Sequence, residues 1–324
     1  MTALPVEPTW SHTKHGFTHR FLREISVAVA YLILLLILFI VRPDFFHVQF
    51  FLTWVTAAPV LVAAVGMSMV IIAREIDISI GSMFSVCGVC AALMAKMGWP
   101  MPVVAMVTLL LGAAFGAANG LLVAFLGLPS IVVTLATMVI MRQSLIWMRQ
   151  GQSVHDTPAD FQWLGHTQHF GQWMLLISAA VILLAFHWGL KHLYAGRAIY
   201  AVGSDREAAR LVGIRPKLTI FSVFMLMGAL SGLAALLNSI RQPVVSPDAG
   251  FGLELQVIAA VVVGGIAITG GRGNLIGTLL GVILLIQIDP ELKWLGRDPA
   301  WQKAIQGAII LIAVSTDALQ RGNK

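Results

Sequence analysis

The chain has 324 residues, of which 58% are hydrophobic and 11% are charged, and its formal net charge is +6. Soluble domains carry about 25% charged residues, so this composition excludes an ordinary soluble protein and is typical of one that spans a membrane. The positive charge does not indicate nucleic acid, because the basic residues cluster in loops that flank long apolar runs. Lipid is the expected surrounding, and no nucleic-acid partner is expected.

The apolar runs predict an all-α, polytopic membrane protein with about ten transmembrane helices, since a helix needs about 20 apolar residues to cross a bilayer. The expected spans are 25–41, 54–73, 83–97, 102–126, 130–149, 173–190, 218–238, 254–269, 274–288 and 302–318. Two of them, 83–97 and 274–288, are short for a complete crossing. The expected organisation is an N-terminal tail (1–24), one transmembrane domain (25–319) and a C-terminal tail (320–324).

Lysine and arginine residues are distributed unevenly between the two sides of this expected bundle. With the N-terminus inside, most of them fall in cytoplasmic segments, including the polar stretch 196–217. The longest loop on the opposite side, 150–172, contains acidic residues but no Lys or Arg beyond its border. Because basic residues are enriched on the cytoplasmic side of membrane proteins, both termini and both tails are predicted to be cytoplasmic.

Two polar turns, 74–82 and 269–274, each follow an apolar run and precede a short helix, which indicates a weak, parallel internal duplication. A polar turn is also what any helical hairpin needs. Glu75 and Asp77 are expected to cap the following helix or to pair with Arg74; alternatively, carboxylates at this place could couple a carrier to an ion gradient. The residues expected to shape the turns are Asp77, Ser79, Gly81, Gly270, Gly271 and Gly273.

Polar side chains inside the spans are candidates for a translocation path, because neutral polar substrates are bound by hydrogen-bonding groups. The candidates are Asn119, Ser130, Thr134, Thr137, Arg142 and Asn238. For the uncharged residues the alternative is packing between helices, where Ser, Thr and Asn form hydrogen bonds. For Arg142 the alternatives are a place on the path and a side chain that reaches outward to the membrane surface.

The stretch 196–217 is the longest polar island of the chain and predicts one short helix. Ser204 and Glu207 fit a capping box at its start. Gly213 fits a left-handed C-cap, and Pro216 prevents the helix from continuing. A helix of about two turns is not stable by itself, so the island is either a solvated loop or a docking helix for a soluble partner.

Four stretches resemble the membrane-spanning permease subunits of bacterial ABC importers for monosaccharides, of the ribose, xylose, rhamnose and autoinducer-2 types. They are Ile76–Ser82, Asn119-Gly120 with Leu128–Thr137, the loop Gly203–Ile214, and Gly264-Gly265 with Gly270–Gly273. Asp205 and the pair Arg74-Glu75 depart from residues common in the family. The stretches 158–165, 287–290 and 299–301 lie closest to the rhamnose and autoinducer-2 branches, with a preference for rhamnose.

The resemblance implies a permease that performs no chemistry and binds no cofactor or metal; a separate cytoplasmic ATPase binds ATP and Mg²⁺. It implies three partners in the bacterial inner membrane system: that ATPase, a periplasmic sugar-binding protein, and a second permease, either identical or a sister chain. Coupling to the ATPase is expected to involve Ser204, Arg206, Glu207, Ala208, Ala209, Gly213 and Ile214. The alternatives are an autoinducer-2 permease of the same family and an ion-coupled sugar carrier that uses Glu75, Asp77 or Arg142.

Overall fold

The computed structural model describes residues 49–294 continuously, together with short helical pieces between residues 28 and 40 and between residues 301 and 311. The structure describes only parts of the expected first and last spans, 25–41 and 302–318, and both tails fall outside the described residues. The continuous segment 49–294 contains the helices named below.

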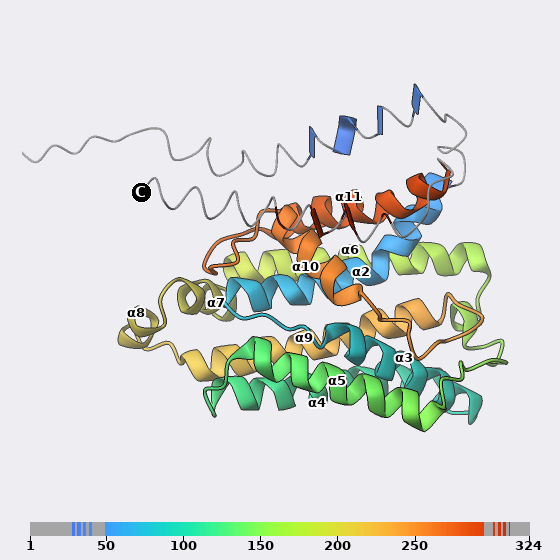
Figure 1. Ribbon diagram of the computed structural model, residues 1–324, viewed down its shortest axis with the longest axis horizontal. Helices are drawn as coiled ribbons and strands as arrows, with labels where there is room; N and C mark the ends of the chain where they lie inside the picture. The colour runs from blue at the N-terminus through green and yellow to red at the C-terminus, as the bar shows by residue number, and fades with distance from the viewer. Residues whose placement is uncertain are drawn as a thin grey trace, which may run out of the picture.

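Within this range the chain folds into a helical bundle whose long helices run side by side (Figure 1). The helices are α2 (Gln49–Ile72), α3 (Ile80–Lys96), α4 (Met101–Ala124), α5 (Ser130–Arg149), α6 (Gln168–His192), α7 (Tyr194–Ser204), α8 (Arg206–Leu211), α9 (Pro216–Ser239), α10 (Leu253–Val263) and α11 (Leu275–Trp294), with a 3₁₀ turn at Gln162–Gly165. In the described part, α2, α4, α5, α6 and α9 are long and apolar enough to cross a membrane. This confirms a polytopic helical membrane protein.

Helix α10 is shorter than the sequence predicts. A complete span is expected over 254–269, but α10 ends at Val263 after 11 residues. At about 1.5 Å per residue such a helix is about 16 Å long, roughly half the hydrocarbon thickness of a bilayer. It stops at Gly264, and the next residue, Gly265, has a φ of 94°. The prediction of a complete crossing here is therefore wrong.

The polar island 196–217 forms two helices where the sequence predicts one. Helix α7 ends at Ser204, and α8 begins at Arg206 after the single extended residue Asp205. Both lie at the same end of the bundle (Figure 1). Helix α7 was not predicted separately because it contains Gly196 and Gly203 and begins before the polar island, at Tyr194; glycine has low helix propensity, although Ala198, Ile199 and Val202 form a buried apolar face.

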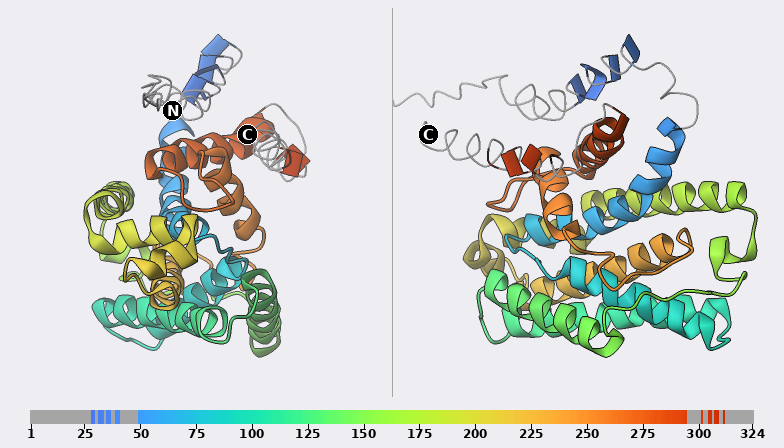
Figure 2. Two further views of the ribbon diagram at one scale, coloured as in Figure 1. Left: turned by 90° about the vertical axis from the view of Figure 1, so that its left-hand side faces the viewer. Right: turned by 45° about the vertical axis from the view of Figure 1, so that its right-hand side comes forward.

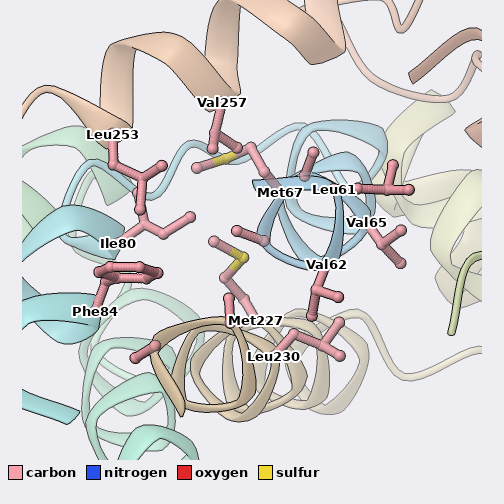
Figure 3. Packing of buried hydrophobic residues seen from close by; sticks show 14 of the residues in the cluster. Leu61, Val62, Val65, Met67, Ile80, Phe84, Met227, Leu230, Leu253 and Val257 are labelled. Carbon is pink, nitrogen blue, oxygen red and sulfur yellow. The ribbon is translucent and has the colours of Figure 1, made fainter. Parts of the chain in front are cut away.

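Helix α2 is the centre of the bundle, and 89% of its apolar window is buried. Figure 3 shows how its side chains meet those of α3, α9 and α10. The labelled residues of this core are Leu61, Val62, Val65 and Met67 from α2, Ile80 and Phe84 from α3, Met227 and Leu230 from α9, and Leu253 and Val257 from α10. Any movement of the end of α2 therefore reaches several helices at once.

Helices α4 and α9 pack backbone against backbone through glycines. A Cβ atom added to Gly112 would lie 2.2 Å from the carbonyl oxygen of Gly228, and one added to Gly116 would lie 2.2 Å from that of Phe224. Small residues four apart allow such close approach between helices in membranes. The spacing of these glycines is therefore a sequence signal for the α4–α9 contact, which the sequence analysis did not predict.

Helices α4, α5 and α6 form the outside of the bundle, and each has only 22% of its apolar window buried. Their outward faces carry large apolar side chains, such as Leu110, Ile140 and Leu184. Exposed apolar patches of this extent mark contact with lipid or with another membrane protein. The arrangement fits a chain that is surrounded by a bilayer.

Candidate functional site

The short helix α8 is capped by Asp205. This residue has the extended backbone that an N-cap requires, and its Oδ1 accepts hydrogen bonds from the backbone N–H groups of Glu207, at 2.8 Å, and Ala208, at 3.0 Å. The predicted capping box of Ser204 and Glu207 is wrong. Ser204 belongs to the last turn of α7 and is helical, so it cannot take the cap position.

The end of α8 has the geometry that the sequence predicts. Gly213 has a φ of 84°, and the next residue, Ile214, donates its N–H to the carbonyl of Ala209 at 3.0 Å. Pro216 then begins α9. A left-handed residue followed by this hydrogen bond is a common way to end a helix. The two turns of α8 are thus closed at both ends.

Helix α8 turns its small side toward the protein and an apolar edge toward solvent. Ala209 is buried, whereas Leu211 and Val212 have 84% and 75% of their surface exposed. Beside them, Glu207 and Arg210 form an exposed ion pair of 3.4 Å, and Ala208 is also exposed. This exposed apolar pair, flanked by charges, is a candidate contact for another protein.

An ion pair ties α8 to the end of α2. The Arg206 guanidinium bonds to the carboxylate of Glu75, whose side chain is only 7% exposed while that of Arg206 is 46% exposed. The sequence predicts that Glu75 caps α3 or pairs with Arg74, and the structure pairs it with neither. The partner lies 131 residues away, so no local pattern could have identified it.

Backbone contacts reinforce this connection. The N–H of Gly271 donates to the carbonyl of Ile72 at 2.8 Å. A Cβ atom at Gly203 would lie 1.7 Å from the same carbonyl oxygen, so only glycine fits where the end of α7 crosses the end of α2. Gly270, Gly271 and Gly273 all have positive φ, as expected of turn residues. The two polar turns found in the sequence therefore meet at one place.

Between α2 and α3 the chain is extended, and α3 begins near the middle of the bundle (Figures 1 and 2). Side chains satisfy the backbone there. Ser130 Oγ accepts the N–H of Ile76 at 3.3 Å, and Thr134 Oγ1 accepts that of Ile78 at 3.1 Å. Non-helical backbone at membrane depth is tolerated where protein groups bond it in this way. Two predicted path residues thus hold the break in place.

Asp77, Ser79 and Asn119 form a buried chain of hydrogen bonds beside this break. Asn119 Nδ2 donates to Ser79 Oγ at 2.8 Å, and the Ser79 hydroxyl and N–H both donate to Asp77 Oδ1. Asp77 belongs to the turn before α3, as predicted, but the prediction that it caps this helix or pairs with Arg74 is wrong: Ser79 stands at the N-cap position without a side-chain cap, and Asp77 binds Ser79. Three expected site residues are therefore brought together with Ser130 and Thr134.

Of the other predicted residues, Thr137 adjoins this cluster through Thr134, whereas Asn238 and Gly81 make their contacts elsewhere. Thr137 donates to the carbonyl of Thr134 at 3.2 Å, and Asn238 accepts from Arg241 at 3.2 Å near the end of α9. Gly81, in the first turn of α3, packs on the loop before α10, where a Cβ atom would lie 2.3 Å from the carbonyl oxygen of Gly250. Gly81 is thus a close-contact position.

Arg142 has a partner that the sequence did not reveal. Its guanidinium bonds to Glu254 Oε1 at 3.2 Å and lies 5.0 Å from the ring centre of Phe251. The second carboxylate oxygen of Glu254 is buried and has no hydrogen-bond partner among the described residues. A charged pair beside an aromatic face inside a membrane bundle is a candidate contact for a polar substrate. The sequence signal for this partner was Glu254 itself, an acidic residue in the first turn of the short apolar helix α10.

These features define a multi-pass membrane protein in which the central helix is fastened to a small polar helix outside the bundle. The chain belongs to the family described as the permease component of the branched-chain amino acid transport system, which matches residues 49–314. It is accordingly a transport permease component.

Curated relatives share much of the chain. The autoinducer 2 import system permease protein LsrC of Escherichia coli O9:H4 (strain HS) is 34% identical over 298 residues, covering 90% of this chain and 85% of the relative. The protein of the same name from Salmonella typhi is 33% identical over 293 residues, covering 90% and 84%. No solved structure matches the chain.

Proposed function

We propose that this chain is the membrane-spanning subunit of an ATP-driven importer in the bacterial inner membrane, and that α8 is the helix on which a cytoplasmic ATPase docks. The observation that carries the proposal is that α8 combines two features. It exposes the apolar residues Leu211 and Val212, and its Arg206 is joined by an ion pair to Glu75 at the buried end of α2. A force on α8 would pass through this ion pair to the centre of the bundle. ATP and Mg²⁺ would be held by the ATPase.

The proposed substrate is a small, neutral, hydroxyl-rich molecule, either a monosaccharide or the autoinducer 2 named for the relatives. Their identity of 34% over most of the chain favours autoinducer 2 over the rhamnose-like sugar preferred from sequence motifs. The family description names branched-chain amino acids, so these belong in the same uptake assay. Within the bundle, Arg142, Glu254 and Phe251 are the proposed substrate contacts.

Two further partners belong to this proposal. A second permease, identical or sister, would cover part of the exposed apolar faces of α4 and α5, because an ATPase dimer needs two docking helices. A soluble binding protein would deliver substrate to the opposite end of the bundle, where the loops after α5 and α9 lie. The ion-coupled carrier gains no support, since Glu75 and Arg142 are already paired and Asp77 is hydrogen-bonded.

The test is co-reconstitution of the chain with the ATPase encoded beside it and measurement of ATPase binding and substrate uptake. Changing Leu211→Asp should weaken ATPase binding at least tenfold, because burying a leucine contributes about 1.5–3 kcal/mol. Leu193→Asp is the matched control: Leu193 is exposed at the same end and occupies the N-cap of α7, where Asp is favourable. Uptake driven by an ion gradient without ATP would overturn the proposal.

A further inference from the structure

A cavity of about 360 Å³ opens where the ends of α2 and α7 meet the glycine-rich turn before α11. Its lining comprises Arg74, Gly203, Ser204, Thr269, Gly270 and Arg272. Cavities that bind small ligands start at about 300 Å³, so the space is large enough for a small organic anion. It lies at the end of α2, the most buried of the long helices, and beside Ser204, the last residue of α7.

The charges around this cavity are unbalanced. Arg74 and Arg272 are both exposed and have no ion-pair partner among the described residues. The carboxylates nearest in the chain are already engaged: Glu75 binds Arg206, and Asp205 caps α8. Two guanidinium groups on one cavity repel each other unless an anion lies between them. The cavity is therefore suited to a negatively charged ligand.

Arg74 owes its position at the cavity to the way α2 ends. It has a φ of 66°, its N–H bonds the carbonyl of Ile71 at 2.9 Å, and the N–H of Glu75 bonds the carbonyl of Val70 at 3.0 Å, which is a common left-handed helix end. The hydroxyl of Thr269, also in the lining, is buried and lacks a hydrogen-bond partner among the described residues. A buried hydroxyl without a partner is a feature that occurs at binding sites.

We propose that this cavity binds a phosphate group, held by the guanidinium groups of Arg74 and Arg272 and by the Thr269 hydroxyl. Arginine forms paired hydrogen bonds with phosphate oxygens, and such charge-assisted bonds are strong. The phosphate can belong to a soluble phosphate monoester or to the headgroup of an anionic lipid. This inference goes beyond the proposed transport function and does not depend on it.

A bound phosphate would bridge two segments that already contact each other at the end of α2. Arg74 follows α2, and Arg272 belongs to the glycine-rich turn that bonds α2 through Gly271 and Ile72. Occupancy would hold these two segments together next to α8. The expected consequence is a stiffer connection between α8 and the bundle.

The test uses the full-length chain in nanodiscs of phosphatidylcholine, titrated with inorganic phosphate and with ribose 5-phosphate by calorimetry. Both probes should bind saturably. Arg272→Gln and Arg74→Asn should each weaken binding at least tenfold; Asn is chosen at position 74 because it adopts positive φ at low cost. Arg197→Gln, which removes an exposed arginine from α7 outside the lining, should leave binding unchanged.

A second arm identifies the source of the phosphate. In nanodiscs that contain phosphatidylglycerol, native mass spectrometry should show lipid retained by the wild type and lost from both variants if the ligand is a lipid headgroup. Arg272→Lys, which keeps the charge but not the guanidinium fork, should give intermediate affinity and guards against a misfolded Gln variant. Absence of phosphate and of lipid binding, or binding unchanged in both charge-removing variants, overturns the proposal.

Discussion

Two ion pairs in the described part of this molecule join residues that are far apart in the chain. Arg206 and Glu75 are 131 positions apart, and Arg142 and Glu254 are 112 apart. In each pair the carboxylate is the more buried partner. Removing one member of a buried pair leaves an unpaired charge and costs about 3–5 kcal/mol, whereas replacing both with apolar residues is often neutral. This asymmetry makes the pairs testable.

We predict that Glu254→Gln lowers the stability of the bundle by about 3 kcal/mol, because Arg142 is left charged beside Phe251 without a counter-ion. The double change Arg142→Met with Glu254→Leu should recover most of this loss. Thermal unfolding of the chain in detergent, followed by tryptophan fluorescence, measures both. If the single and double variants are equally destabilised, the loss of stability comes from altered packing at the site and not from an unpaired charge.

At the scale of elements, short helices are positioned by their neighbours and long ones by their own composition. Helices α2, α4, α5, α6 and α9 follow the predicted apolar runs to within a few residues at each end. Helices α8 and α10 are too short to be stable alone. They are held by the cap at Asp205, the ion pair at Glu75 and the packing of Leu253 and Val257 on the core.

The glycine contact between α4 and α9 gives a prediction at this scale. Gly112→Ala should destabilise the bundle by about 1–3 kcal/mol, because its methyl group would lie 2.2 Å from the carbonyl oxygen of Gly228. Gly189→Ala is the matched control in α6: its nearest neighbour is a side-chain atom at 3.6 Å, so the gain in helix propensity should stabilise by about 0.5–1 kcal/mol. Chemical unfolding in detergent distinguishes the two. Equal effects would show that the glycines do not set the helix separation.

At the scale of the whole molecule, both ends of the bundle carry distinct chemistry. Helices α7 and α8, the cavity and most of the basic residues that the structure describes lie at one end, and the loop that follows α5 lies at the other (Figure 1). The uneven distribution of Lys and Arg places the first end in the cytoplasm. This orientation remains a prediction from the sequence.

Cysteine labelling checks the orientation. In a chain whose Cys87 and Cys90 are replaced by Ala, Leu211→Cys should react with a membrane-impermeant maleimide only after the cells are opened. Ala159→Cys, exposed in the loop after α5, should react in spheroplasts that are still intact. The reverse pattern would invert the bundle and place the proposed docking surface on the side that a cytoplasmic ATPase cannot reach.

Composition and the length of the apolar runs by themselves determined the class of this protein and the position of its long helices, because a bilayer demands about 20 apolar residues per crossing. Gly213 and Pro216 likewise marked the end of α8, since their backbone preferences are local. Only the tertiary structure decided which polar groups meet. Residues far apart in the chain supply the partners of Glu75 and Arg142 and the side chains that hold the break before α3. They also form the contact between the two polar turns. Pairing over such distances is set by packing.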